Sequence, residues 1–168
     1  MTLKNILGVL LVLLACWASS GSLAQPTPRM GELSSVDLEF MAQQRTLLRD
    51  LAAARLGRQF NGDQERDLDL LQSLLDKQLV RPDQTRELQA MGVIMGDLLS
   101  AEFDLHWVIY EDREGRSRAL RYRESDNVIF PITMISRRRE VGNQTSVADI
   151  YQKAADIIIT SKPSLPFQ

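Results

Sequence analysis

The chain is poor in the residues on which most recognisable active sites depend. Its 168 residues include one cysteine and one histidine. It has no glycine-rich dinucleotide or phosphate-binding loop, no Gly-x-Ser-x-Gly turn and no His-Glu-x-x-His zinc motif. A lone histidine rules out a histidine-rich metal centre, and a Ser-His-Asp triad would have to use His106. We therefore expect no cofactor and no metal, and we assign no catalytic residue.

A dominant charge of either sign is also missing. The sequence holds 20 Lys and Arg against 22 Asp and Glu, for a formal net charge of -2 at pH 7. Such a balance provides no overall field that would attract nucleic acid or anionic lipid. A nucleic-acid partner is therefore not expected.

The N-terminus carries the three parts of a bacterial secretory signal peptide. Lys4 gives a positive start, and Ile6–Ala18 is an uncharged apolar run. Small residues follow, with Ser22 and Ala24 at the positions that a signal peptidase inspects. We interpret residues 1–24 as a cleaved signal, which predicts a periplasmic protein. The apolar run is shorter than the roughly 20 residues that span a bilayer, so an uncleaved anchor is the less favoured interpretation.

Cys16 leaves a second processing route open. It follows a Leu-Leu-Ala run, which resembles the lipobox of bacterial lipoproteins, where the cysteine is lipidated and becomes the first residue. Leu14 and Trp17 fit that pattern poorly, so cleavage after Ala24 is the favoured route. On that route the exported chain has no cysteine, and its fold depends on its core without disulfides. Contact with a membrane is expected only if Cys16 is lipidated.

The rest of the chain divides into a tether, one domain and a tail. Residues 25–34 contain two prolines, a glycine and two hydroxyl residues, and are predicted to be a flexible tether. Residues 35–160 are long enough for a single domain with a sizeable core, and residues 161–168 are expected to be a flexible tail. Amphipathic spacing and capping residues predict helices over 36–56, 63–80, 83–102 and about 145–160.

The third of these helices differs from the others. Between Leu88 and Phe103 apolar residues occur nearly all round it, which is typical of a helix covered on every side. Gly92 and Gly96 are four residues apart and share a face, so another strand or helix is expected to pack closely there. Asp97 interrupts the apolar stretch and is either exposed at a seam or buried with a partner.

Three runs separated by short turns predict a small antiparallel sheet. The predicted strands are 105–111, 118–123 and 128–136. Pro131 cannot donate a ladder hydrogen bond, so the third strand should lie at an edge or carry a bulge. We therefore expect an α+β fold, with helices packed on a three-stranded antiparallel meander and with a C-terminal helix.

Three stretches around this predicted sheet resemble a known bacterial family. They are Leu-Gln-Ala-Met-Gly from Leu88 with Gly96-Asp97, then Trp107-Val108 with Glu111-Asp112 and Gly115, and finally Phe-Pro-Ile-Thr-Met-Ile-Ser over 130–136. Together they are similar to the core of a family catalogued as a domain of unknown function, number 3806, over roughly residues 65–155. The resemblance implies no activity and no catalytic residue.

Arginines are the main candidates for a binding surface. Arg118, Arg121 and Arg123 lie on the second predicted strand, and Arg137 and Arg138 follow the third. Strand alternation could bring several of them onto one face, where they would bind an anion or a carboxylate. A solvated basic rim is the simpler interpretation. We expect a non-catalytic binding or accessory module of the bacterial envelope, whose partner is a protein, a peptide or an anionic envelope component.

Two other functions remain open. Asp97 and Glu111, with His106, are candidates for a small carboxylate-dependent hydrolase or lyase, provided that the three side chains share a cleft. A lipid-anchored envelope protein is the other, and it depends on lipidation of Cys16.

Overall fold

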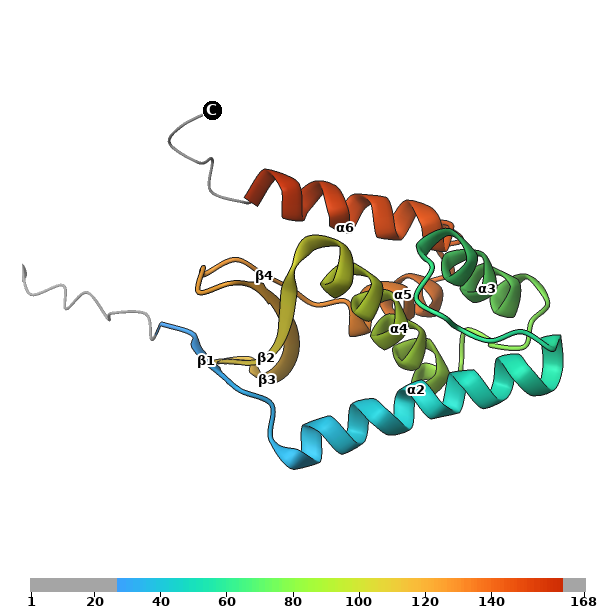
Figure 1. Ribbon diagram of the computed structural model, residues 1–168, viewed down its shortest axis with the longest axis horizontal. Coiled ribbons are helices and arrows are strands. Elements are labelled where there is room, and N and C mark those ends of the chain that lie inside the picture. The colour runs from blue at the N-terminus through green and yellow to red at the C-terminus, as the bar shows by residue number, and fades with distance from the viewer. Residues whose placement is uncertain (1–26, 162–168) are drawn as a thin grey trace, which may run out of the picture.

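The computed structural model describes residues 27–161 and has the predicted α+β class (Figure 1). Within that range the helices are α2 (Ser35–Leu56), α3 (Gln64–Asp76), α4 (Thr85–Phe103), α5 (Ile132–Glu140) and α6 (Val147–Ser161). The strands are β1 (Arg29–Gly31), β2 (Leu105–Asp112), β3 (Gly115–Tyr122) and β4 (Val128–Ile129). The predicted signal peptide, the first two residues of the predicted tether and the predicted tail beyond Ser161 lie outside the described residues. Between residues 27 and 161 no helix combines the length and the apolar character needed to cross a bilayer.

Helix α4 is the centre of the fold, as its all-round apolar sequence predicted. Its residues Leu88, Met91, Met95 and Leu99 are completely buried. Figure 1 shows α4 between α2 on one side and α3 and α6 on the other, with the sheet toward its C-terminal end. Because α4 is covered by its neighbours, the functional surface has to lie on the elements around it.

The two glycines of α4 permit the close packing that their spacing predicted. A Cβ atom on Gly92 would lie 2.5 Å from the backbone oxygen of Ile132 in α5. A Cβ atom on Gly96 would overlap with the indole ring of Trp107 in β2. Carbon atoms in contact are normally about 3.5–4 Å apart. Helix α4 therefore packs directly against α5 and β2 because it has no side chain at these two positions.

Helix α2 begins and ends close to its predicted bounds. Its N-cap is Ser34, which forms a reciprocal capping box with Asp37. Gly57 ends the helix in the left-handed conformation, with a φ of 63°. The helix thus presents Asp37 in its first turn, close to the sheet.

Helices α3 and α6 are present, with ends that differ from the prediction. Helix α3 follows its predicted cap, Asp63, but it ends at Asp76 rather than at Val80. The residues after it form a turn in which Gln78 has a φ of 53°, and a helix cannot continue through that conformation. Helix α6 extends through Ser161, which the sequence analysis assigned to the tail.

The predicted tether is wrong at Arg29–Gly31, which forms strand β1. This strand pairs antiparallel with β2, and Met30 lies opposite Tyr110. Within residues 27–161 the sheet therefore has four strands, in the order β1-β2-β3-β4, and not three. A strand this short shows no detectable alternation, and its backbone pairs with an edge that comes much later in the chain.

The predicted third strand is wrong beyond Ile129. Only Val128–Ile129 forms β4, which is an edge strand, and a helix begins at Ile132. Pro131 has helical dihedral angles (φ -62°, ψ -33°) at the N-cap of α5, where its missing N–H leaves no hydrogen bond unmade. The close contact between Ile132 and Gly92 then outweighs the strand preference of this β-branched run.

Strand alternation gives the sheet two different faces. Trp107 and Leu120 lie opposite each other on the face that packs against the helices, which we call the core face. His106 and Arg121 lie opposite each other on the other side, which we call the outer face. His106 is exposed, so the outer face is partly in contact with water, as expected.

Candidate functional site

Strand β3 has one edge that is only partly paired. It pairs with β2 over its whole length but with β4 only at Leu120 and Arg121. Among residues 27–161 no strand covers the other side of Gly115–Ala119. A groove of about 440 Å³, which we call the β3 groove, lies beside this open edge. The side chains that line it include Phe40, Tyr110, Asp112, Glu114, Arg116, Arg118, Phe130 and Arg137.

A buried carboxylate holds two of the arginines of the groove. Asp37, in the first turn of α2, is 1% exposed and accepts hydrogen bonds from both Nη atoms of Arg116, at 2.9 and 2.5 Å. The Nη2 atom of Arg118 lies 2.8 Å from Asp37 Oδ1. Both arginines reach the same carboxylate because they are two residues apart on β3 and so share the core face. The hydrogen bonds from Arg116 hold the pKa of the Asp37 carboxyl well below its usual range, against the opposing effect of burial.

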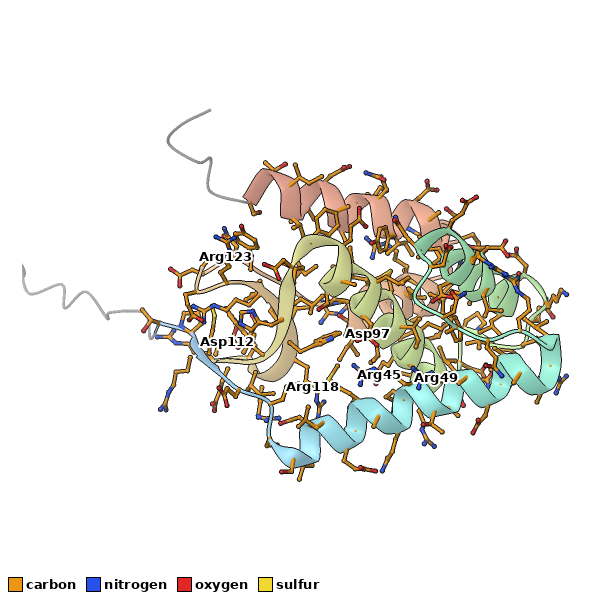
Figure 2. The ribbon with its side chains drawn as sticks, in the orientation of Figure 1. Arg45, Arg49, Asp97, Asp112, Arg118 and Arg123 are labelled. Atoms are coloured by element: carbon orange, nitrogen blue, oxygen red, sulfur yellow. The ribbon has the colours of Figure 1, made fainter. Side chains whose placement is uncertain are left out.

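Arg118 is fixed from two sides. Its guanidinium carbon lies 4.1 Å from the centroid of the Phe40 ring, in a cation–π contact, while its Nη2 atom binds Asp37. Its Nε atom is buried and has no hydrogen-bond partner within residues 27–161. Figure 2 shows Arg118 between the sheet and the N-terminal part of α2. Arg118 is therefore held in place and keeps one unused donor, which is uncommon for a buried polar group.

The third arginine of the groove is free, and the groove also contains acidic side chains. Arg137 is exposed on α5 and makes no hydrogen bond or ion pair with any residue that the structure describes. Asp112 and Glu114 supply carboxylates at the turn between β2 and β3, where Asp112 Oδ1 accepts the N–H of Glu114 at 2.8 Å. The site thus combines a free guanidinium group on α5 with carboxylates at the turn between β2 and β3.

The structure brings two of the five predicted arginines together. Arg118 and Arg137 line the β3 groove, one from β3 and one from α5. Arg121 lies on the outer face, where its Nε atom donates to the backbone oxygen of Ser125 at 2.6 Å and closes the turn between β3 and β4. Odd and even positions of a strand face opposite ways, so Arg118 and Arg121 do not share a face.

The other two predicted arginines make local contacts. Arg123 follows β3 with a φ of 46°, and its guanidinium carbon lies 5.2 Å from the centroid of the Tyr122 ring. Arg138 donates to the backbone oxygen of Met134, one helical turn earlier, at 2.6 Å. Figure 2 shows Arg123 and Arg118 in separate parts of the sheet. The predicted arginines therefore do not form one continuous surface.

Three residues of this site were not predicted from the sequence. Arg116 falls in a predicted turn, although β3 already begins at Gly115. The available signal was its two-residue spacing from Arg118, which places both side chains on one face of a strand. Nothing in the local pattern indicated that Phe40 and Asp37, on the first helix, would meet that face.

The three candidates for acid–base chemistry do not share a cleft. The two oxygens of Asp97 bind Arg45 at 2.7 and 2.8 Å, and Trp107 Nε1 donates to the same carboxylate at 3.1 Å. His106 lies on the outer face, and Glu111 is exposed opposite Arg29 of β1. The groove beside Asp97 contains neither of the others, and the β3 groove contains none of the three. Of the two alternatives for Asp97, the structure shows a partly buried acid with a partner.

The fold and the site define a small α+β module, in which helices cover one face of an antiparallel sheet and a charged groove follows an open strand edge. The chain belongs to the family described as Domain of unknown function (DUF3806), whose model matches residues 67–151. This match confirms the resemblance carried by the motifs in α4 and the sheet. The matched region contains β3 and α5, whereas α2, which supplies Asp37 and Phe40 to the site, precedes it.

A solved structure has a similar fold. It is the crystal structure of a protein from Bacteroides thetaiotaomicron VPI-5482, with a TM-score of 0.70 and 20% sequence identity. The similarity covers 79% of this chain and 48% of that chain, so this chain spans about half the length of that protein. At this level of identity the likeness shows the fold alone. The comparison with curated proteins found no match.

Proposed function

We propose that this protein is an exported, non-catalytic binding module that holds an anionic ligand in the β3 groove. The observation that carries the proposal is the presence of three guanidinium groups, those of Arg116, Arg118 and Arg137, around one groove beside an open strand edge. Guanidinium groups bind carboxylates through paired, charge-assisted hydrogen bonds. In this site Arg137 supplies a free group and Arg118 supplies one that is already held in place.

The charges around the groove support this proposal. Asp37 binds Arg116 and Arg118 together, and Glu111 lies opposite Arg116 in β2, so the charges of these two arginines already face carboxylates. Asp112 and Glu114 lie at the turn and form no ion pair with the three arginines within the described part of the chain. A carboxylate that enters between β3 and α5 therefore meets the charge of Arg137, which no carboxylate within the described residues binds.

The N-terminal pattern supports a periplasmic location. Lys4, the apolar run Ile6–Ala18 and the small residues before Gln25 have the order that signal peptidase requires. Intact mass spectrometry of the protein from the envelope fraction tests this part of the proposal. A chain that begins at Gln25 supports export, and a diacylglyceryl group on Cys16 would instead make the protein a lipid-anchored envelope protein. An unprocessed chain in the cytosol would overturn export.

Succinate, a small dicarboxylate, is a direct probe of the groove. When it is titrated into 15N-labelled protein, the Nε–Hε NMR signals of Arg118 and Arg137 should shift more than those of other arginines. Arg137→Gln should weaken binding by about tenfold, as expected for the loss of one charge-assisted hydrogen-bond pair. The matched variant Arg121→Gln should bind like the unaltered protein. Shifts that are absent, or that persist unchanged in Arg137→Gln, would overturn the proposal.

A further inference from the structure

The open edge of β3 presents backbone groups to the β3 groove. In an antiparallel pair, residues that exchange both backbone hydrogen bonds with the partner alternate with residues that direct these groups away from it. Asp112 and Gly115 flank a two-residue turn, so these two residues exchange both backbone hydrogen bonds with each other. Counted from that pair, Arg116 and Arg118 direct their N–H and C=O groups away from β2 and toward the groove. By the same alternation, Leu120 directs its backbone N–H and C=O groups toward β4, and Leu120 is indeed paired with that strand.

We propose that the β3 groove binds an extended peptide segment, which adds to the sheet as a further strand beside β3. This inference rests on the proposed function and names the class of its ligand. Main-chain hydrogen bonds to Arg116 and Arg118 hold the segment, as in other cases of strand addition. The open part of β3, Gly115–Ala119, is long enough to pair with about five residues of peptide.

The walls of the groove match the alternating side chains of an added strand. Phe40 lies with Arg118 on the core-face side of β3. Phe130 meets Tyr110 of the outer face edge to face, with ring centroids 5.3 Å apart. Successive side chains of a strand point to opposite faces, so apolar side chains on either side of the added strand meet an aromatic ring. A compact anion would contact the guanidinium groups but would make no contact with either ring.

The charged side chains of the groove specify the chemistry of the peptide further. Arg137 is free to bind a carboxylate, and Asp112 and Glu114 at the turn are placed to bind an ammonium or guanidinium group. The expected ligand is therefore a short extended segment with apolar residues in the middle, an acidic group at one end and a basic group at the other.

The same residues disfavour pairing between two copies of this chain. A symmetric antiparallel pair of β3 edges would bring Arg116 and Arg118 of one copy opposite the same arginines of the other. Like charges directly opposite each other destabilise a strand pair, and charged side chains on an edge are a common protection against self-association. A peptide that carries a carboxylate does not meet this repulsion, so we favour the peptide over a second copy.

Two reversed peptides, Lys-Val-Val-Val-Asp and Asp-Val-Val-Val-Lys, both acetylated and amidated, test the inference on the whole protein. At least one should shift the backbone amide signals of Arg116 and Arg118 and slow their hydrogen exchange by about tenfold or more. N-methylation of the peptide amides on one edge should weaken binding by about tenfold or more, because those amides pair with β3. N-methylation on the other edge should change the affinity by less than about twofold, because those amides face away from the sheet.

The variants separate this inference from the proposed function. Arg137→Gln should weaken peptide binding, whereas the matched Arg121→Gln should leave it unchanged. If succinate binds at Arg137 but neither peptide binds, strand addition is overturned and the anion-binding function stands. If neither succinate nor a peptide binds, both are overturned. Peptide binding that is insensitive to N-methylation, or protection of the β3 amides in a peptide-free dimer detected by light scattering, also overturns strand addition.

Discussion

Helix α2 is held by two carboxylate–arginine clusters that use the same chemistry in different surroundings. Near the start of the helix, Asp37 binds Arg116 and Arg118 of the sheet. About two turns later, Arg45 binds Asp97 of α4, and Figure 2 shows this pair between the two helices. Asp37 is 1% exposed, whereas the side chain of Asp97 is 33% exposed.

The two clusters also differ in the number of arginines that share the carboxylate and in unused bonding capacity. At Asp97 one guanidinium group meets one carboxylate, and Trp107 Nε1 supplies a further donor. At Asp37 two guanidinium groups meet one carboxylate, and the Nε atom of Arg118 has no partner within the described residues. The Asp97 cluster joins two helices, whereas the Asp37 cluster lies beside a groove and keeps a buried donor that no described residue uses. The position of an ion pair and its unused donors, rather than its presence, therefore point to function.

The largest difference between the two clusters is expected when the carboxylate charge of each is removed in turn and the free energy of unfolding is measured. Asp37→Asn should lower the free energy of unfolding by about 3 kcal/mol, because two arginines lose their counterion at a buried position. Asp97→Asn should lower it by about 1 kcal/mol, because Arg45 can turn toward water. Urea denaturation of the two variants measures both values. Equal losses would show that burial and the number of partners do not distinguish the clusters.

Gly96→Ala disturbs the Asp97 cluster without changing a charge. The added methyl group would overlap with the indole of Trp107, whose Nε1 donates to Asp97. The expected loss of stability is about 1–3 kcal/mol, which exceeds the gain in helix propensity of up to about 1 kcal/mol. Gly31→Ala is the matched control, since nothing surrounds that position, and it should change stability by less than about 0.5 kcal/mol. Calorimetry that finds both variants neutral would contradict the close packing of α4.

Acid should weaken the Asp37 cluster in a predictable direction. The folded state holds the pKa of Asp37 below the unfolded value of about 3.9, so its carboxylate contributes stability that is fully present above that value. As the pH falls below about 4, this contribution decreases by up to about 1.4 kcal/mol per pH unit. The stability difference between the unaltered protein and Asp37→Asn should therefore shrink in urea denaturation between about pH 5 and pH 2.5. A difference that stays constant over this range would contradict the assignment.

The smallest effect is expected outside both clusters, at Arg123. Its φ of 46° is unfavourable for a side-chain-bearing residue, so Arg123→Gly relieves strain while it removes the contact with Tyr122. The two effects oppose each other, and the net change in stability should stay within about 0.5 kcal/mol. The affinity for succinate should not change. Loss of succinate binding in this variant would favour the continuous arginine surface that the sequence suggested.

Sequence patterns predicted the structure where near neighbours in the chain determine the environment of a residue. The all-round apolar pattern of α4 identified the central helix, and the spacing of Gly92 and Gly96 identified the side that packs closely. The turn around Gly115 identified the hairpin of β2 and β3. In each case the period of the pattern, rather than a distant contact, carried the information.

The prediction failed where distant contacts decide. The β-branched run around Ile132 predicts a strand by its composition, and it becomes helical where α4 offers the backbone of Gly92 for close packing. The strand β1 exists because β2 offers it an edge. The candidate site was only partly predictable for the same reason. Arg118 and Arg137 were identifiable as arginines in the right region, but the carboxylate that positions Arg118 lies on the first helix.

Asp37 and Arg116 are 79 residues apart in the chain, and β1 pairs with β2 across a similar separation. Contacts that close so long a loop form late, because the entropy of closure has to be overcome before they contribute stability. The part of the chain that is synthesised early therefore stays unpaired until the hairpin after α4 has been made. This order of assembly would delay formation of the β3 groove until both α2 and the hairpin of β2 and β3 are in place.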